Sequence, residues 1–256
     1  MKGRWALKVT LSVVALVMCS LTWALDYYPV KLGMRWRYEV QEKGGSYVQI
    51  VTIPRSDKID GKRVFIQEVR KAEDGSRIVE KAWLLPEKEG VKLVKSSSYD
   101  VESSTVTPLK PLTIIKEPLK LGDRWDKRTN GKVRITGLIP QIGRYTIDID
   151  VLWISSFKAE KEEAIPDARG GRIYKCIKLI EETKLTVKGI RIDASNESVK
   201  SFILQNTSLR KGNVLKYQTV KWLAPGVGPV KVSETFIFPG QPVRRRVKKL
   251  IDFHRP

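Results

Sequence analysis

The chain has 256 residues and a formal net charge of +20, from 48 Lys and Arg against 28 Asp and Glu. One His and two Cys argue against histidine-rich zinc sites and exclude a network of disulfides. The length fits one large β-domain or two small ones, and the charge indicates either an anionic partner or a basic surface without a dedicated partner.

The N-terminus has the pattern of an export signal. A basic start precedes the apolar run Val9–Leu21, and small residues stand before a cleavage site that follows Ala24. The run is short for a membrane span. We therefore expect residues 1–24 to be a cleaved signal peptide and the protein to be exported, periplasmic or associated with the cell envelope. The alternatives are an uncleaved anchor and lipidation at Cys19.

One stretch of eight residues occurs twice. Pro29–Trp36 and Pro118–Trp125 share Pro, Lys, Leu, Gly, Arg and Trp at equivalent positions. Pro suits the approach to a turn, Gly permits a positive φ, and Trp buries a large apolar surface. Each copy therefore predicts a turn that begins a β-strand. We interpret the two tryptophans as core anchors; the alternative is a pair that stacks on a ligand.

Alternation of apolar and polar residues predicts antiparallel hairpins through the first half of the chain. The expected strands are Trp36–Gln41, Tyr47–Ile53, Arg63–Val69, Arg77–Leu85 and Val91–Lys95. Turn signals separate them at Gly44–Gly45, Asp60–Gly61, Asp74–Gly75 and Glu89–Gly90. The stretch 96–117 is rich in Ser, Thr and Pro, and we expect it to be a connection that crosses the molecule.

The second half continues in the same way. We expect a hairpin at Asn130–Gly131, a charged loop over Lys158–Ile165, and further strands at Tyr145–Trp153, around Cys176, and at 184–192, 199–205, 214–222, 230–238 and 243–253. No amphipathic helix of useful length is predicted after residue 24, which argues against a Rossmann or βαβ plan.

The sequence offers three candidates for catalytic groups: an aspartate pair, a cysteine and a histidine. Asp148 and Asp150 share one face of a strand, with carboxylates roughly 6–7 Å apart, but the opposite face is apolar, so we expect both to point to water. Cys176 lies in a strand-like alternation and is interpreted as a buried structural thiol. The only His, His254, lies near the C-terminus and offers it no base.

These patterns predict an all-β fold. We expect one large curved antiparallel sheet, a meander or half-barrel, with the internal repeat described above and little helix. A single antiparallel domain would span residues 25–256, with 25–107 and 118–256 as candidate halves.

Three stretches resemble a group of uncharacterised bacterial exported β-proteins and lipoproteins. Asp26–Tyr38 is similar to the group's Tyr-Phe-Pro-Leu-x-x-Gly-x-x-Trp-x-Tyr opening, and Trp222–Lys231 to its closing Ala-Pro-Gly-x-Gly-x-Val-Lys motif. Arg172–Lys178 resembles a mid-chain Gly-x-aromatic-x-Cys stretch, with the spacing off by one. The resemblance implies a large curved sheet, akin by analogy to the half-barrel of lipoprotein-carrier proteins, and no particular activity.

The function expected is a non-enzymatic binding module of the cell envelope that holds a lipid or apolar ligand in a concave sheet with a basic rim. Candidate lining residues, each also explained as ordinary core, are Trp36, Trp83, Trp125, Trp153 and Trp222. Candidate anion contacts on the last strand are Arg244, Arg245, Arg246, Lys248 and Lys249. The same basic residues are also explained as guards of an edge strand.

Other functions remain as alternatives. The protein could instead be a structural or assembly protein whose basic face binds an anionic polymer or a partner protein. Anionic lipid, lipopolysaccharide and cell-wall polymer are the expected partners, with peripheral membrane contact as a candidate. A hydrolase would need Asp148 and Asp150 in a cleft, and the export signal argues against a nucleic-acid binder. No catalytic residue, metal or cofactor is expected.

Overall fold

A computed structural model of the chain describes residues 27–73, 77–99, 103–139, 143–206, 210–237 and 242–256. The expected signal peptide with Cys19, and the turn expected at Asp74–Gly75, lie outside these ranges. The described residues form thirteen strands and one helix: β1 (Arg35–Glu42), β2 (Gly45–Ile59), β3 (Lys62–Lys71), β4 (Ile78–Glu87), β5 (Gly90–Tyr99), β6 (Ser103–Pro108), β7 (Leu112–Lys116), β8 (Arg124–Ile139), β9 (Gly143–Pro166), β10 (Ile173–Ala194), α2 (Glu197–Asn206), β11 (Val214–Ala224), β12 (Gly228–Ile237) and β13 (Arg244–His254).

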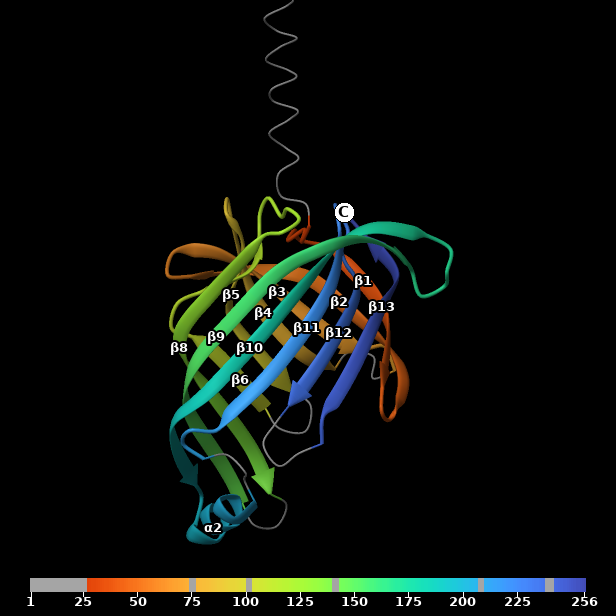
Figure 1. Cartoon of the computed structure of the whole chain (residues 1–256). Coiled ribbons are helices and arrows are strands. Elements are labelled where there is room, and N and C mark those ends of the chain that lie inside the picture. Colours follow the sequence, from red (N-terminus) through yellow and green to blue (C-terminus); the bar gives the residue numbers. More distant parts are fainter. Residues whose placement is uncertain (1–26, 74–76, 100–102, 140–142, 207–209, 238–241) are drawn as a thin grey trace, which may run out of the picture.

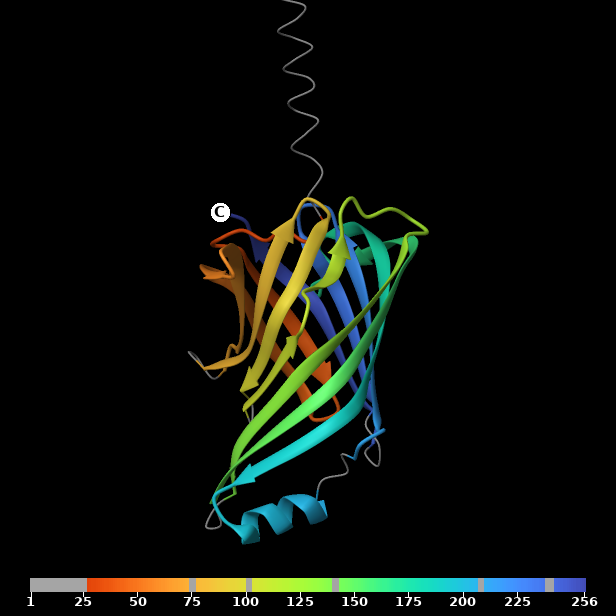
Figure 2. The same ribbon diagram turned by 90° about the vertical axis from the view of Figure 1, so that its left-hand side faces the viewer.

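The strands form one antiparallel sheet that closes on itself (Figures 1 and 2). Its order is β4-β3-β2-β1-β13-β12-β11-β10-β9-β8-β6-β5-β7, and β4 also pairs with β5. The ring contains twelve strands, because β6 and β7 lie along different parts of β5. The predicted all-β antiparallel fold is confirmed, whereas the predicted open half-barrel is wrong. Closure requires β1 and β13 to pair, which leaves neither as an edge.

Side chains alternate between the interior and the exterior of the ring. Its upper end, where the described chain begins and ends in Figure 1, is filled with apolar side chains. Trp36 and Leu250 belong to one buried cluster, and Leu84 and Leu179 to a second. The segment that precedes β1 contributes Tyr28, whose hydroxyl bonds with the amide of Gln67 on β3. The upper interior is therefore packed rather than hollow.

The two copies of the repeated stretch form equivalent structures. Gly33 and Gly122 have positive φ angles of 81° and 83°. The N–H of each glycine donates to a carbonyl of the neighbouring strand at 2.9 Å, that of Ile53 in the first copy and of Ala159 in the second. A strand begins two residues after each glycine, and its tryptophan faces inward. The prediction of a turn that begins a strand is confirmed in both copies.

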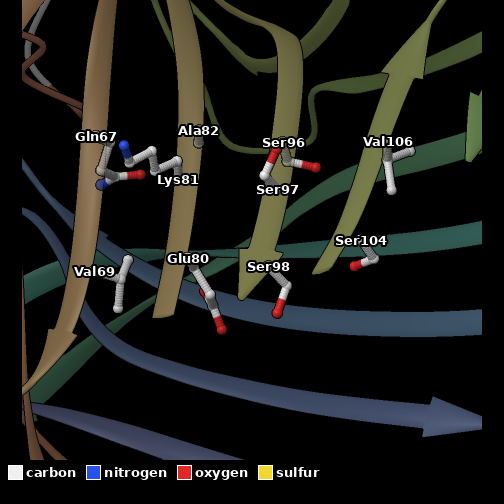
Figure 3. A pocket seen from close by; sticks show the side chains of 10 residues that line it. All are labelled: Gln67, Val69, Glu80, Lys81, Ala82, Ser96, Ser97, Ser98, Ser104 and Val106. Atoms are coloured by element: carbon white, nitrogen blue, oxygen red, sulfur yellow. The ribbon is translucent and has the colours of Figure 1, made fainter. Parts of the chain in front are cut away.

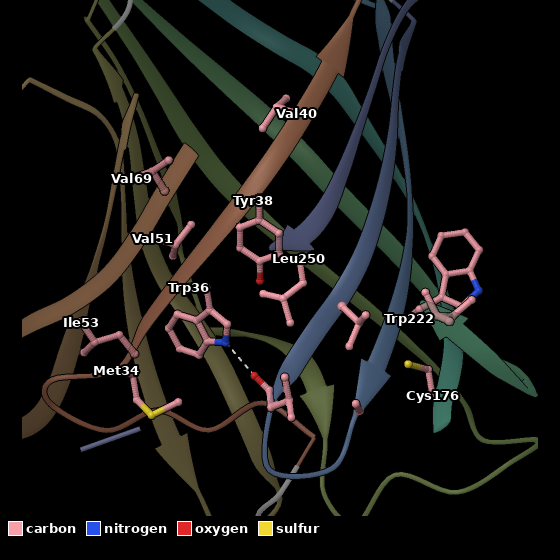
Figure 4. Packing of buried hydrophobic residues seen from close by; sticks show 14 of the residues in the cluster. Met34, Trp36, Tyr38, Val40, Val51, Ile53, Val69, Cys176, Trp222 and Leu250 are labelled. Atoms are coloured by element: carbon pink, nitrogen blue, oxygen red, sulfur yellow. Dashed lines mark hydrogen bonds between the residues drawn. The ribbon is translucent and has the colours of Figure 1, made fainter. Parts of the chain in front are cut away.

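The opening and closing motifs meet at the filled end of the barrel, which is the upper end in Figure 1 and lies toward the bottom of Figure 4. The indole Nε1–H of Trp36 donates to the carbonyl of Val227 at 2.6 Å, and the hydroxyl of Tyr38 donates to the carbonyl of Pro229 at 2.8 Å. These acceptors lie in and just after the turn between β11 and β12. Two stretches about 190 residues apart are thus held together by buried or partly buried hydrogen bonds.

The helix α2 corrects the strand expected over 199–205. The Asn196 side chain accepts a hydrogen bond from the N–H of Val199 at 2.9 Å, as an N-cap does. Val199 and Ile203 lie one turn apart and pack against Ile147 and Val187 of β9 and β10. The described residues contain no helix long and apolar enough to cross a membrane.

Two expected breaks in the sheet are wrong. β8 continues through Asn130–Gly131, where an added Cβ on the glycine would lie 3.1 Å from the carbonyl oxygen of Thr107. The glycine therefore serves the close approach of β6 rather than a turn. β9 likewise continues through the charged stretch expected as a loop, and its backbone pairs there with β10. Glu160 in this stretch pairs with Lys158 at 3.0 Å and across the strands with Lys178 at 2.8 Å.

The stretch 96–117 was expected to be a connection that crosses the molecule, and most of it is strand in the wall of the barrel. β5 extends to Tyr99, and β6 and β7 follow before Pro118. Serines and threonines in this stretch pair across strands, as between Ser97 and Thr105 at 3.0 Å. Small polar residues here form a wall of the barrel, which the composition alone did not distinguish from a loop.

We expect Gly122→Ala to lower the free energy of unfolding by roughly 1–2 kcal/mol. No atom outside its chain neighbours lies within 4 Å of the added Cβ, so the cost is backbone strain at positive φ. Gly171→Ala is the matched control, because that position is equally open but lacks a positive φ. Urea titration measures both; equal changes in the two variants would contradict the strained turn.

Candidate functional site

The interior of the ring is hollow at its lower end. A cavity of about 810 Å³ lies there, lined by Glu42, Tyr47, Gln49, Lys71, Val79, Glu80, Ser98, Ser104, Ile135, Phe236, Arg244, Arg245 and Arg246. These residues come from nine of the twelve ring strands, all except β9, β10 and β11, and most of them lie near the hairpin ends. They can meet around one space only if that space is the interior of the barrel.

Small side chains keep one wall of this space open (Figure 3). A second cavity of about 220 Å³ runs along β3 to β6, where Ala82, Ser96, Ser98 and Ser104 are among the lining residues. It shares Glu80 and two of these serines with the larger cavity, so the two adjoin. Short side chains do not reach across the barrel, which explains why the interior is filled above and hollow here.

A group of buried charges forms the opposite wall. Glu234 on β12 lies 2.6 Å from Arg246 and 3.5 Å from Lys248, both on β13, and Arg246 lies 3.3 Å from Glu80 on β4. Burial raises the pKa of Glu234, but the charges of Lys248 and Arg246 outweigh this effect and hold it below its ordinary value. Glu234 is therefore ionised and neutralises the two inward cations of β13.

Other groups at the cavity have no such partner. Gln49 is 1% exposed, and its Oε1 accepts no hydrogen bond from a described residue. Four cationic side chains line the cavity: Lys71, Arg244, Arg245 and Arg246. Among the described residues, acids form ion pairs with Arg246 and not with the other three. The Lys71 ammonium lies 5.0 Å from the centre of the Tyr47 ring. A buried acceptor, an aromatic ring and the cations Lys71, Arg244 and Arg245 thus face the same space.

Three of the five candidate tryptophans face the interior. Trp36 is 2% exposed and belongs to the packed upper core. Trp125 stacks on Phe157 with ring centroids 4.8 Å apart. Trp153 is buried, and its Nε1–H donates to Ser155 at 2.9 Å. None of the three is among the residues that line the 810 Å³ cavity.

The other two tryptophans alternate with the inward-facing residues of their strands, but Trp222 is buried at 9% exposure and belongs to the same cluster as Trp36. Trp83 is covered by the Lys95 ammonium at 4.8 Å from its ring centre, and Trp222 by that of Lys231 at 4.5 Å. The Nε1–H of Trp222 donates to Glu163 at 3.0 Å. Figure 4 shows the side chains of Trp222 and Trp36 well apart. The structure therefore does not bring the five tryptophans together.

The basic residues of β13 divide between two faces. The register with β12 places three basic residues of β13 opposite inward positions: Arg244, Arg246 and Lys248. The residues between them, Arg245 and Lys249, belong to the other face of the strand. Arg245 nevertheless lines the lower end of the cavity. β13 pairs with both β1 and β12, so the interpretation of these residues as guards of an edge strand is wrong.

The expectation that Asp148 and Asp150 point to water is confirmed. Asp150 is exposed. Asp148 accepts hydrogen bonds from Arg134 at 2.7 and 3.1 Å and from Arg191 at 2.9 Å, which lower its pKa to about 2. Neither carboxylate is among the residues that line the cavities described here.

Cys176 is a buried free thiol, as expected. It is 1% exposed, and burial, followed by the charge of Glu163, raises its pKa to about 12. We expect a Cys19→Ser protein at pH 8 to react with a thiol reagent at least about 100-fold more slowly when folded than in urea, because little thiolate forms and access is blocked. Reaction at similar rates in both states would contradict the buried position.

Sequence reasoning missed the polar residues that face the cavity. Gln49 lies between Tyr47 and Val51 on the inward face of β2, and Glu234 lies between Val232 and Phe236 on β12. A polar residue in the apolar register of a strand was the available signal, since such a residue must find a partner inside the fold.

The fold and the cavity define a closed antiparallel β-barrel with a filled upper end and a cationic cavity at its lower end. No protein-family model matches the sequence, and no curated protein matches it. Two solved structures are similar in fold: a "putative lipoprotein" of Parabacteroides distasonis, 10% identical, and a "putative exported protein with YmcC-like fold" of Bacteroides fragilis, 11% identical. Each alignment covers 90% of this chain and 99% or 100% of the other, with a TM-score of 0.42. Likeness at this level carries no argument about function.

Proposed function

We propose that this protein is an exported, non-enzymatic binding module of the cell envelope, and that it holds an anionic ligand rich in hydroxyl groups inside the barrel. An acidic sugar unit of an envelope polymer has this chemistry. The observation that carries the proposal is the 810 Å³ cavity with its unpartnered Gln49 acceptor and its three cations without ion pairs among the described residues. Export rests on the sequence of residues 1–24.

Several of the cavity groups match such a ligand, although the lining also includes the carboxylate of Glu42. A guanidinium binds a carboxylate through charge-assisted, often bidentate hydrogen bonds, which Arg244 and Arg245 can supply at the open end. Gln49 Oε1 and the Glu80 carboxylate can accept hydrogen bonds from hydroxyl groups deeper inside. The volume lies within the range of small-molecule sites.

An acyl chain fits the same lining poorly. It would separate Glu80, Arg246 and Gln49 from water and offer no hydrogen bond in return, which costs free energy for each buried polar group. The apolar parts of the interior are already filled by the chain's own side chains. The lining therefore favours a polar anion over the lipid or apolar ligand expected from the sequence.

Calorimetric titration with an oligogalacturonate tests the proposal, with an uncharged glucose oligomer of equal length and decanoate as comparison ligands. We expect binding of the acidic oligomer that weakens with salt and falls about 10- to 100-fold in the double variant Lys71→Gln, Arg244→Gln, from the loss of charge-assisted hydrogen bonds.

The matched control is the double variant Lys31→Gln, Lys249→Gln. It removes the same charge from positions that do not line the cavity. Equal losses in the two double variants would contradict a site in the cavity. Binding of decanoate or of the neutral oligomer as tightly as the acidic one would contradict the ligand class.

A further inference from the structure

A second cationic cavity lies between α2 and the face of β10 on which Ile190 and Ile192 pair with the buried Ile149 and Ile147 of β9. Its volume is about 560 Å³, and it is lined by Lys188, Gly189, Ile190, Ile192, Lys200, Leu204, Arg210 and Lys211. It shares no residue with the cavity in the barrel. We call it the helix groove.

The fold brings the basic residues of the groove together from three elements. Lys188 lies in the β-bulge of β10 between Val187 and Gly189. Two backbone hydrogen bonds of 2.9 Å join the turn before β11 to that bulge. The N–H of Gly212 donates to the carbonyl of Val187, and the N–H of Val187 donates to the carbonyl of Asn213. This pairing places Lys211 beside the bulge.

The helix supplies the other wall. Val199 and Ile203 pack inward against β9 and β10, so the neighbouring positions Lys200 and Leu204, one turn apart, line the groove. Leu204 is 49% exposed. With Ile190 and Ile192 it gives the groove an apolar part beside its cations.

No carboxylate is among the described residues that line this groove, although three lysines are. At two other places in the described chain an acid lies between converging cations, Glu234 inside the barrel and Asp148 on its outer face. Among the lysines that line the groove, Lys200 forms an ion pair with a described acid, Glu197, at 3.3 Å. The Glu197 side chain is 84% exposed. Mutual repulsion of like charges favours an external anion here.

We propose that the helix groove binds the headgroup of an anionic phospholipid at a membrane surface. The cations meet the phosphate, and Leu204 with the two isoleucines meets the first methylenes of the lipid. The placement of α2 supports a surface as the source of the lipid. Figure 2 shows the helix lying across the lowest part of the molecule, beyond the lower ends of the strands.

Co-sedimentation of the full chain with vesicles tests this assignment. Vesicles of phosphatidylcholine with and without 30% phosphatidylglycerol are compared at low and high salt. We expect binding only to the anionic vesicles, weakened by salt. The double variant Lys200→Gln, Lys211→Gln should bind roughly 30-fold more weakly, at about fivefold for each lysine near an anionic surface.

Two further variants separate the groove from net charge and from the barrel cavity. Lys31→Gln with Lys120→Gln removes the same charge from the opposite end of the molecule and should leave vesicle binding unchanged, as should Arg244→Gln in the barrel. Leu204→Ser should weaken vesicle binding without changing its salt dependence.

Several outcomes would overturn the proposal. One is equal loss in the two lysine double variants, which would mean that net charge alone attracts the protein. Others are full competition by millimolar inorganic phosphate, an unaltered Leu204→Ser variant, or no binding to anionic vesicles. If soluble dihexanoyl phosphatidylglycerol binds but vesicles do not, a free amphiphile replaces the membrane as the ligand and the surface assignment is wrong.

Discussion

Replacing Glu234 by Gln is expected to lower the free energy of unfolding by about 3–5 kcal/mol, the range measured when one partner of a buried ion pair is removed. The amide keeps the shape of the side chain but loses the charge that neutralises Arg246 and Lys248. All three side chains are more than four-fifths buried. Two cations would then remain inside the barrel, and of these Arg246 would keep an ion pair, with Glu80 at 3.3 Å.

The control for this prediction is Asp148→Asn. Asp148 also lies between two cations, Arg134 and Arg191, but on the outer face, where 61% and 78% of their side chains are exposed. Solvent screens such pairs, so little or no change is expected. Adding Arg246→Met to Glu234→Gln should restore part of the loss. Equal effects of the inner and outer substitutions in urea titrations would contradict the buried charge group.

The effect of Glu234→Gln should also depend on pH. The pKa of Glu234 is lowered in the folded protein, so its stabilising contribution is present above the unfolded pKa of about 4.3 and is lost as pH falls through the folded value. Wild type and variant should therefore differ fully at pH 7 and converge in acid. A difference that is constant from pH 7 to pH 3 would contradict this linkage.

Trp36→Ala should destabilise the protein by about 3–5 kcal/mol, the cost of truncating a buried aromatic side chain. The indole is 2% exposed, packs in the upper core and donates to the Val227 carbonyl at 2.6 Å. Its loss would leave a cavity and an unpaired carbonyl where β1 meets the turn between β11 and β12. Thermal and urea unfolding measure the change.

Two substitutions divide this effect into its parts. Trp36→Phe keeps most of the apolar contact and should cost about 1–3 kcal/mol through the unpaired carbonyl. Trp83→Ala removes a tryptophan that lies on the outer face under Lys95 and is half-buried, and it should cost less than Trp36→Ala. If Trp83→Ala is the more damaging change, the assignment of interior and exterior faces is wrong.

The sequence predicted the strands with strict alternation and the turns with Gly well. Asp60–Gly61 and the two copies of the repeated stretch turn as expected, because a positive φ at Gly is a local requirement. The errors arose where a local signal had a non-local cause. Gly131 is needed for the approach of β6 rather than for a turn, and Glu160 is paired with a lysine of the next strand rather than solvated in a loop.

Closure of the barrel could not be predicted in the same way. It depends on pairing between β1 and β13, at opposite ends of the chain, and no local pattern encodes that contact. The same limit applies to the site. The basic run of β13 was recognised, but which of its members face Glu234 depends on the register with β12, and the cavity depends on short side chains from β4 to β6.

Every statement about a cavity inside this protein requires the ring to be closed, and NMR distance contacts between backbone protons test closure most directly. Contacts that join Tyr38 to Leu250 and Val40 to Lys248 are expected, together with contacts that join Ala82 to Ser96. Slow amide exchange should accompany them along β13. The absence of contacts between β1 and β13, with both strands exchanging as free edges, would show an open sheet and contradict the barrel.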